Sequence, residues 1–154
     1  MNTFVLDYDI TFCARYHCDK HVVKMVLEYA QLLCSPYENG IAPYRRVSYN
    51  HPCAKWVRQS QGNYEWLLKL AFKLAEEYTY RYGKIHKSLD VINWCARNYD
   101  TIRFVESEKT EFVMVMPEEY KTDDVVESYR NYYKYGKINI IKYTRRKYPK
   151  WLYK

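Results

Sequence analysis

Four side chains that could take part in chemistry fall on one line of a predicted helix. When residues 16–33 are drawn at about 100° per residue, two histidines, a lysine and a glutamate lie within about a 60° arc. These residues are His17, His21, Lys24 and Glu28. Such a stripe can transfer protons, hold an anion or bind a metal ion. The alternative is that it is the solvated side of an amphipathic helix.

A pocket for acid–base chemistry or anion binding explains this stripe better than a metal site. Two histidines four positions apart can share a metal ion, but zinc sites usually take three or four ligands with further support behind them. The sequence holds no second group of Cys and His residues at ligand spacing. We therefore expect Glu28 to act as acid or base, with no bound metal and no other cofactor.

A second segment with phosphate-binding character begins the next predicted helix. Asn50 and His51 precede Pro52, and Arg58 follows on the same helix. Anions are favoured at a helix N-terminus because its backbone N–H groups are unpaired there. The alternative is that Asn50 only caps the helix and His51 only packs against it.

A third segment surrounds the turn at Gly83. Arg81, Lys84 and His86 lie close together in the sequence around this glycine, so they could grip a phosphate group. A solvated helix end with the same charges is an equally simple interpretation.

The C-terminal segment, residues 128–154, is basic and aromatic. It holds nine of the 25 Lys and Arg residues and none of the 18 Asp and Glu residues, so the rest of the chain is slightly acidic. Tyr129 and Arg130 open a stretch in which tyrosines alternate with these cations. Cations neutralise phosphates and aromatic rings stack on exposed bases, so the segment favours nucleic acid as a partner. The alternatives are a solubility tail and tyrosines that belong to the core.

The stripe and these segments require a mainly α-helical framework, which we expect to be one domain over residues 1–154. Helical spacing of apolar residues predicts a bundle of about four to six helices with short extended segments. The first should run from a cap at Asp9 or Thr11 to about Leu33, and the second from Pro52 to Gly83 with a break near Gly62. Two more should begin at Ser88 and near residue 122. Residues 3–6 suggest an edge strand or an extended arm.

Cysteine usage and hydropathy suggest a cytoplasmic protein. The 5 cysteines are an odd number without a CxxC pair, which favours free thiols in a reducing compartment. We expect no membrane partner, because no apolar run approaches the length of a membrane span.

The same segments resemble a group of small proteins from phages, large viruses and some bacteria. The shared pattern covers nearly the whole chain and is carried by five motifs: HCDKHVVKM from His17, NHP from Asn50, EEYxxRYGKxH from Glu76, MPEEY from Met116 and YRNYY from Tyr129. The activity of this group is unsettled.

A looser similarity links the chain to the pyrimidine-dimer DNA glycosylases of the phage endonuclease V type. Those are small, basic, helical proteins with a catalytic glutamate in the first helix, which would be Glu28, and an aromatic, basic C-terminal run like residues 132–137. The family attacks with the amine of a small residue exposed when Met1 is removed. Asn2 disfavours that removal, so the resemblance leaves Lys20, Lys24 or a Glu28-activated water as alternatives.

Taken together, these features favour a base-processing enzyme that acts on duplex DNA, a glycosylase or glycosylase/lyase. The target nucleotide would flip into a pocket lined by His17, His21, Lys24 and Glu28. Its phosphates would be held by the other segments, through Asn50, His51, Arg58, Arg81, Lys84, His86, Tyr129 and Arg130. Two alternatives remain: an enzyme that acts on free nucleotides or a small phosphorylated metabolite, and a non-enzymatic viral protein that binds a nucleotide or a host partner.

Overall fold

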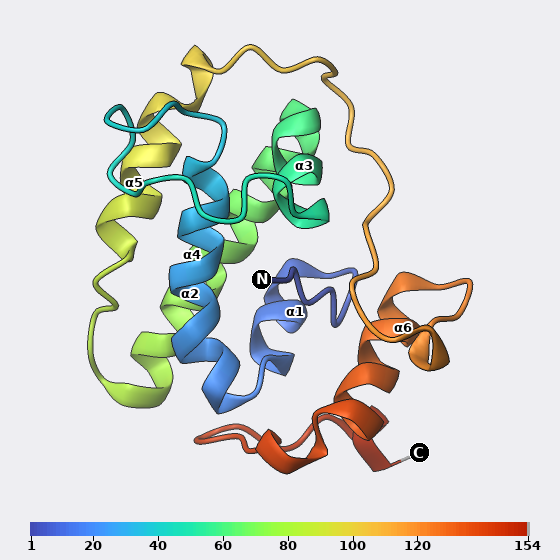
Figure 1. The fold of residues 1–154 in the computed structure, drawn as a ribbon. Coiled ribbons are helices and arrows are strands. Elements are labelled where there is room, and N and C mark those ends of the chain that lie inside the picture. Colours follow the sequence, from blue (N-terminus) through green and yellow to red (C-terminus); the bar gives the residue numbers. More distant parts are fainter. Residues whose placement is uncertain (154) are drawn as a thin grey trace.

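The computed structural model describes residues 1–153, and six α-helices form its framework (Figure 1). They are α1 (Ile10–Tyr16), α2 (Asp19–Cys34), α3 (Pro52–Gln59), α4 (Gln61–Tyr82), α5 (Leu89–Asn98) and α6 (Val125–Asn131). Over these described residues there is no β-strand, only an isolated bridge between Ser60 and Glu106. The predicted mainly helical architecture with short extended segments is confirmed.

The expected first helix is two helices, because the chain turns at His17 and Cys18. Asp9 caps α1 by accepting a hydrogen bond from the Phe12 backbone N–H, as predicted. His17 then adopts an extended conformation with φ −63° and ψ 128°, and α2 starts at Asp19. The prediction of one continuous helix was therefore wrong, and His17 does not share a helical stripe with His21.

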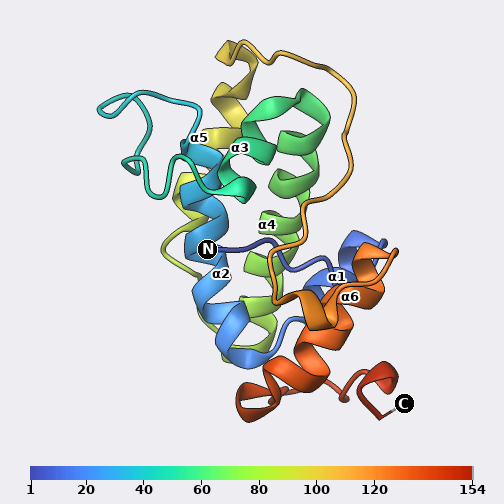
Figure 2. The same ribbon diagram turned by 45° about the vertical axis from the view of Figure 1, so that its right-hand side comes forward.

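The long helices α2 and α4 pack against each other at the centre, and α1, α3 and α5 pack around them (Figures 1 and 2). Large aromatic side chains fill the interior, and Tyr29 of α2 and Tyr64 of α4 are completely buried. Burial of a tyrosine ring is favourable only when its hydroxyl finds a partner. Tyr64 donates to the Leu33 carbonyl at 2.6 Å, and Tyr29 contacts the N-terminal arm.

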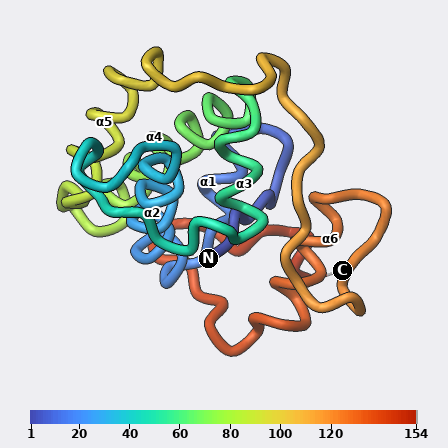
Figure 3. The backbone as a smooth tube through the Cα atoms, turned by 45° about the horizontal axis from the view of Figure 1, so that its top comes forward, coloured from blue at the N-terminus to red at the C-terminus, as the bar shows by residue number. Residues whose placement is uncertain are grey.

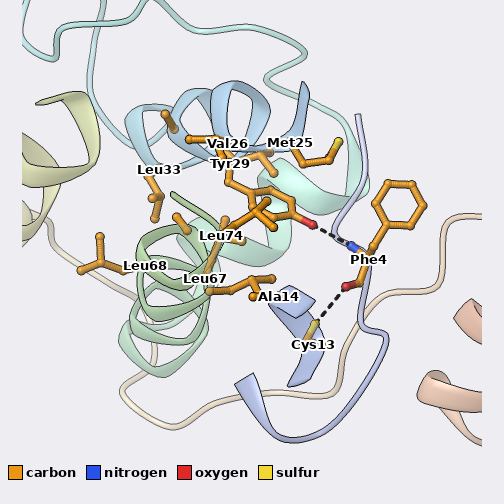
Figure 4. Close-up of a cluster of buried hydrophobic side chains, with 14 of the residues drawn as sticks. Phe4, Cys13, Ala14, Met25, Val26, Tyr29, Leu33, Leu67, Leu68 and Leu74 are labelled. Carbon is orange, nitrogen blue, oxygen red and sulfur yellow. Dashed lines mark hydrogen bonds between the residues drawn. The ribbon is translucent and has the colours of Figure 1, made fainter. Parts of the chain in front are cut away.

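The N-terminal arm, residues 1–8, runs through the middle of the molecule as an extended chain (Figure 2). Residues 2–6 are all buried, which fits the arm rather than the edge strand among the two predicted forms. The Phe4 backbone N–H donates to the Tyr29 hydroxyl at 3.1 Å, and the Cys13 thiol donates to the Phe4 carbonyl at 3.2 Å (Figure 4). These bonds satisfy backbone groups that would otherwise be buried without a partner.

A long strap, residues 102–117, connects the end of α5 to the region of α6 along one side of the molecule (Figure 3). It passes so close to Gly62 in the first turn of α4 that an added Cβ would meet the Lys109 backbone nitrogen at 2.4 Å. The Gln61 and Gly62 backbone N–H groups donate to the carbonyls of Glu106 and Ser107. Gly62, which we expected near a break in the helix, therefore leaves room for the strap. The break between α3 and α4 lies two residues earlier, at Ser60.

The C-terminal segment folds back onto the start of α2 and the end of α4. Glu77 accepts hydrogen bonds from Arg81 and Arg146, and Arg81 also reaches Asp19 at 3.0 Å. Asp19 in turn accepts from the backbone and hydroxyl of Thr144. This buried network is electrically matched, so removing one member would leave a charge without its partner.

Among residues 1–153, no helix is long and apolar enough to cross a membrane. All five cysteines are buried and free.

Candidate active site

A cavity of about 420 Å³ lies where the N-terminal arm, α2, the strap and the turn after α6 meet. Its size is in the range of ligand pockets, which usually measure several hundred cubic ångströms. We call it the central cavity; it is lined by Met1, Asn2, Phe4, His21, Lys24, Met25, Glu28, Val115, Met116, Pro117, Tyr132 and Lys137.

The main polar group in the central cavity is Glu28, which faces two amines. Its Oε1 lies 3.2 Å from the α-amino nitrogen of Met1, and its Oε2 lies 3.5 Å from Lys24 Nζ. Oε2 is buried and has no hydrogen-bond partner within residues 1–153, so the Lys24 contact is an ion pair without hydrogen-bond geometry. A buried carboxylate oxygen without a donor is costly, and it leaves one acceptor free for a ligand.

His21 forms part of the cavity wall as a neutral imidazole. It stacks on Phe4 with ring centroids 4.2 Å apart, and its Nδ1 lies 2.5 Å from the Tyr133 hydroxyl. That hydroxyl also accepts a hydrogen bond from the Cys18 backbone N–H at 3.2 Å. Burial, reinforced by the nearby His17, lowers the pKa of His21 to about 3.

His51 lies close enough to the Met1 amine and to Glu28 for both charges to act on its pKa. Its Nδ1 accepts a hydrogen bond from the Cys53 backbone N–H at 3.0 Å, so His51 itself caps α3. Burial lowers the pKa of His51, the charge of the N-terminal amine lowers it further, and Glu28 opposes that change. The structure thus brings His51 near the amine and Glu28, although it is not part of the cavity wall.

His17 is a core residue rather than a member of the cavity. It is completely buried, with Nδ1–H donating to the Cys13 carbonyl at 2.7 Å and Nε2 accepting from the Tyr29 hydroxyl at 2.7 Å. Burial lowers the pKa of His17 to about 4, so the ring is neutral. Its place follows from the break between α1 and α2, which turns the ring towards the arm.

Two of the arginines proposed for phosphate binding have structural partners instead. Arg58 donates to the Tyr49 carbonyl at 2.6 Å and stacks on the Tyr49 ring, outside the central cavity. The Arg81 guanidinium is fully buried among Glu77, Asp19 and the Arg15 carbonyl.

The turn after α4 and the residue before His51 also lie away from the central cavity. Asn50 and Lys84 are exposed, and Gly83 ends α4 with φ +68°, as predicted. His86 Nε2 donates to the Val23 carbonyl at 3.0 Å, on a part of α2 that faces away from Glu28.

Tyr129 and Arg130 act on the N-terminal arm. The Tyr129 hydroxyl donates to Asn2 Oδ1 at 2.8 Å, and Arg130 binds the Leu6 carbonyl and pairs with Asp7 at 2.7 Å. Neither lines the central cavity, although Tyr132 and Lys137 from the following turn do. Neither was predicted as a site residue, although both belong to the run at residues 132–137 that resembles the C-terminal run of the glycosylases.

The comparisons with known proteins identify the family. Residues 1–91, more than half of the chain, match the family described as pyrimidine dimer DNA glycosylase. The chain belongs to this family. No curated protein and no solved structure matches it. The predicted similarity to the pyrimidine-dimer DNA glycosylases is therefore confirmed, whereas the resemblance to the phage and large-virus group stays a prediction.

The match contains the arm, Glu28, Lys24 and His51, and it ends before the strap and α6. A DNA glycosylase type of function follows at the level of the family. The part of the cavity wall that comes from residues 115–137 lies beyond the matched region.

Proposed function

We propose that this protein excises damaged pyrimidines from duplex DNA and then cleaves the strand, with the Met1 amine as nucleophile and Glu28 as its proton acceptor. The observation that carries the proposal is the contact of 3.2 Å between the amine and Glu28 Oε1 inside the central cavity. Membership in the pyrimidine dimer DNA glycosylase family supports the choice of substrate.

The Met1 amine is better suited to this role than Lys24. Its nitrogen lies 3.2 Å from Glu28 Oε1, whereas Lys24 Nζ lies 3.5 Å from Oε2 without hydrogen-bond geometry. The Met1 side chain is 6% exposed, whereas Lys24 is 66% exposed and its ammonium group stays hydrated. Lys20, the other candidate, is exposed and is not part of the cavity wall.

The proposed reaction has two stages. Glu28 takes a proton from the ammonium group, and the neutral amine attacks C1′ of the flipped nucleotide. The C1′–N bond to the pyrimidine breaks, and its electron pair leaves with the base, which takes up a proton. The nitrogen loses a proton, the C1′–O4′ bond breaks as a double bond forms between C1′ and the nitrogen, and O4′ takes up a proton, which gives a protonated imine.

Loss of a proton from C2′ then drives elimination of the 3′ phosphate, which cleaves the strand. Water hydrolyses the imine and returns the free amine. The unpartnered Glu28 Oε2 is an acceptor available for proton transfer in these steps.

Cations around the mouth of the cavity favour a phosphate-bearing ligand. Lys24 of α2 and Lys137 of the basic C-terminal segment both line it. Flipping the nucleotide out of the duplex costs a few kcal/mol, and this cost is smaller at damaged sites where stacking is already weakened.

Borohydride trapping tests the proposal. Borohydride reduces the imine to a stable amine, so duplex DNA with a pyrimidine dimer or an abasic site should become linked to the N-terminal peptide, as mass spectrometry of the digest would show. An adduct on the Lys24 peptide would assign the nucleophile to Lys24, and the absence of any adduct would contradict the imine mechanism.

Glu28→Gln tests the role of the carboxylate. The loss of its proton acceptor should slow adduct formation at least about 100-fold, while DNA affinity stays within a few-fold of wild type. Glu76→Gln, on an exposed carboxylate of α4 that is 69% exposed, is the matched control and should trap normally.

A further inference from the structure

Asn2, the residue next to the N-terminal amine, is buried and its side chain is hydrogen-bonded to the protein. It is 8% exposed. Its Oδ1 accepts from the Thr3 backbone N–H at 2.8 Å and from the Tyr129 hydroxyl at 2.8 Å, and its Nδ2 donates to the Val115 carbonyl at 2.8 Å. The side chain thus makes three hydrogen bonds, to the arm, to α6 and to the strap.

Tyr129 completes the connection between these three segments. Its ring is completely buried, and its hydroxyl also accepts from the Val115 backbone N–H at 3.2 Å and lies 3.2 Å from the Val113 carbonyl. Both α6 and the strap lie outside the region that matches the family. This part of the chain therefore holds the Asn2 side chain through the Tyr129 hydroxyl and the Val115 carbonyl.

We propose that the Asn2–Tyr129–Val115 cluster is a positioning device that sets the register of the arm, so that the amine of Met1 rather than that of residue 2 meets Glu28. The inference rests on the proposed function, because it assigns the cluster a role in the imine chemistry. Neither Asn2 nor Tyr129 attacks the substrate; both act through the amine.

The geometry explains why the register matters. The Met1 amine lies 3.2 Å from Glu28 Oε1. Consecutive residues are spaced by about 3.6 Å along an extended chain, so loss of Met1 would move the terminal amine by about that distance from its present position. The Asn2 side chain, held by its three hydrogen bonds, would keep residue 2 in place. A misplacement of about 1 Å can slow a reaction by about 100-fold.

The first test compares two buried tyrosines. Tyr129→Phe removes the hydroxyl that holds Asn2, and Tyr64→Phe removes a hydroxyl that is equally buried but bonds to the Leu33 carbonyl at the far end of α2. Both variants should melt at a lower temperature. In single-turnover trapping below both melting temperatures, only Tyr129→Phe should be slowed, by about tenfold or more, with unchanged DNA affinity.

Equal trapping rates for the two variants would overturn the positioning role of Tyr129. If wild-type protein forms no adduct with abasic duplex DNA, the proposed function itself fails, so the two failures are distinguishable. The positioning role of the cluster is supported if wild type and Tyr64→Phe form the adduct at the same rate and Tyr129→Phe forms it more slowly.

The second test changes the register. Asn2→Thr places a small residue after Met1, which permits removal of Met1 during expression and exposes the amine of residue 2. Intact mass should show Met1 retained in wild type and lost in the variant, and the variant should trap at least about tenfold more slowly. Wild type without Met1, or a truncated variant that traps as fast as wild type, would overturn the proposal.

Discussion

At the scale of single residues, the two buried histidines make stability depend on pH. The pKa of His17 is lowered to about 4 and that of His21 to about 3, chiefly by burial, from a value near 6.5 in the unfolded chain. Below pH 6.5 the unfolded state therefore binds more protons than the native state, and the free energy of unfolding decreases as the pH is lowered. The loss for His17 alone should reach on the order of 3 kcal/mol at pH 4.

Urea unfolding between pH 7 and pH 5 measures this effect. His17→Gln should flatten the dependence by about 1.4 kcal/mol per pH unit below pH 6, because one titrating ring is gone. Tyr64→Phe is the control: it removes a buried hydroxyl that keeps its proton throughout this pH range, so it should lower stability and leave the pH dependence as it is. An unchanged slope in His17→Gln would show that the ring is protonated in the native state.

The sequence identified the residue types of the site better than their roles. Helical spacing predicts that Glu28 and Lys24 share one face of α2, and the structure has the two side chains 3.5 Å apart there. His17 and Arg81 were assigned to a pocket or a phosphate, yet both are bonded within the core. Residue type shows what a side chain can do, whereas its partners come from elements far apart in the sequence.

At the scale of elements, the strap depends on the absence of a side chain at Gly62. A Cβ there would lie 2.4 Å from the Lys109 backbone nitrogen, so the strap must shift or α4 must distort. Gly62→Ala should cost about 1–3 kcal/mol, in spite of the better helix propensity of alanine. Gln61→Ala, at the exposed neighbouring position, should change stability by less than about 0.5 kcal/mol.

Guanidinium unfolding of the two variants provides the comparison. Because the strap also carries Val115 to the central cavity, Gly62→Ala should weaken trapping of abasic DNA as well as stability. A variant as stable as wild type would show that the strap is not held against α4 at this point.

Local signals located most ends of the helices. Pro52 lies in the first turn of α3, and Gly83 ends α4 in the left-handed region, where glycine has no steric cost. The break at His17 had no such signal, because neither glycine nor proline occurs there. Its cause is tertiary: the His17 ring bonds to Tyr29, and the Asp19 backbone N–H donates to the Lys142 carbonyl.

At the scale of the whole molecule, the central cavity unites segments that span nearly the entire chain. Met1 and Lys137 line the same space, with the strap between them. Spacing in the sequence could not predict this arrangement, since periodicity describes one element at a time. The family resemblance, in contrast, could be predicted from short motifs, and the match over residues 1–91 confirms it.

The distribution of charge over the molecule predicts how DNA binding responds to salt. In the C-terminal segment, Arg130 and Arg146 are paired with Asp7 and Glu77. Four lysines form no ion pair within residues 1–153, and these are Lys137, Lys142, Lys147 and Lys150. If each contacts one phosphate, the logarithm of the duplex association constant should fall with the logarithm of salt concentration at a slope of about −3 to −4.

Replacement of two of these lysines tests which end of the molecule meets the duplex. Lys142 and Lys147 are both exposed, and their joint change to alanine should reduce the slope by about 2, since two fewer counterions are released. Arg97 and Arg103 are exposed at the opposite end, near the end of α5 (Figure 1), and provide a control of equal charge. Their joint replacement should leave the slope within about 0.5 of wild type. The reverse result would place the duplex against α5, where the phosphates could not lie near Glu28 and the amine.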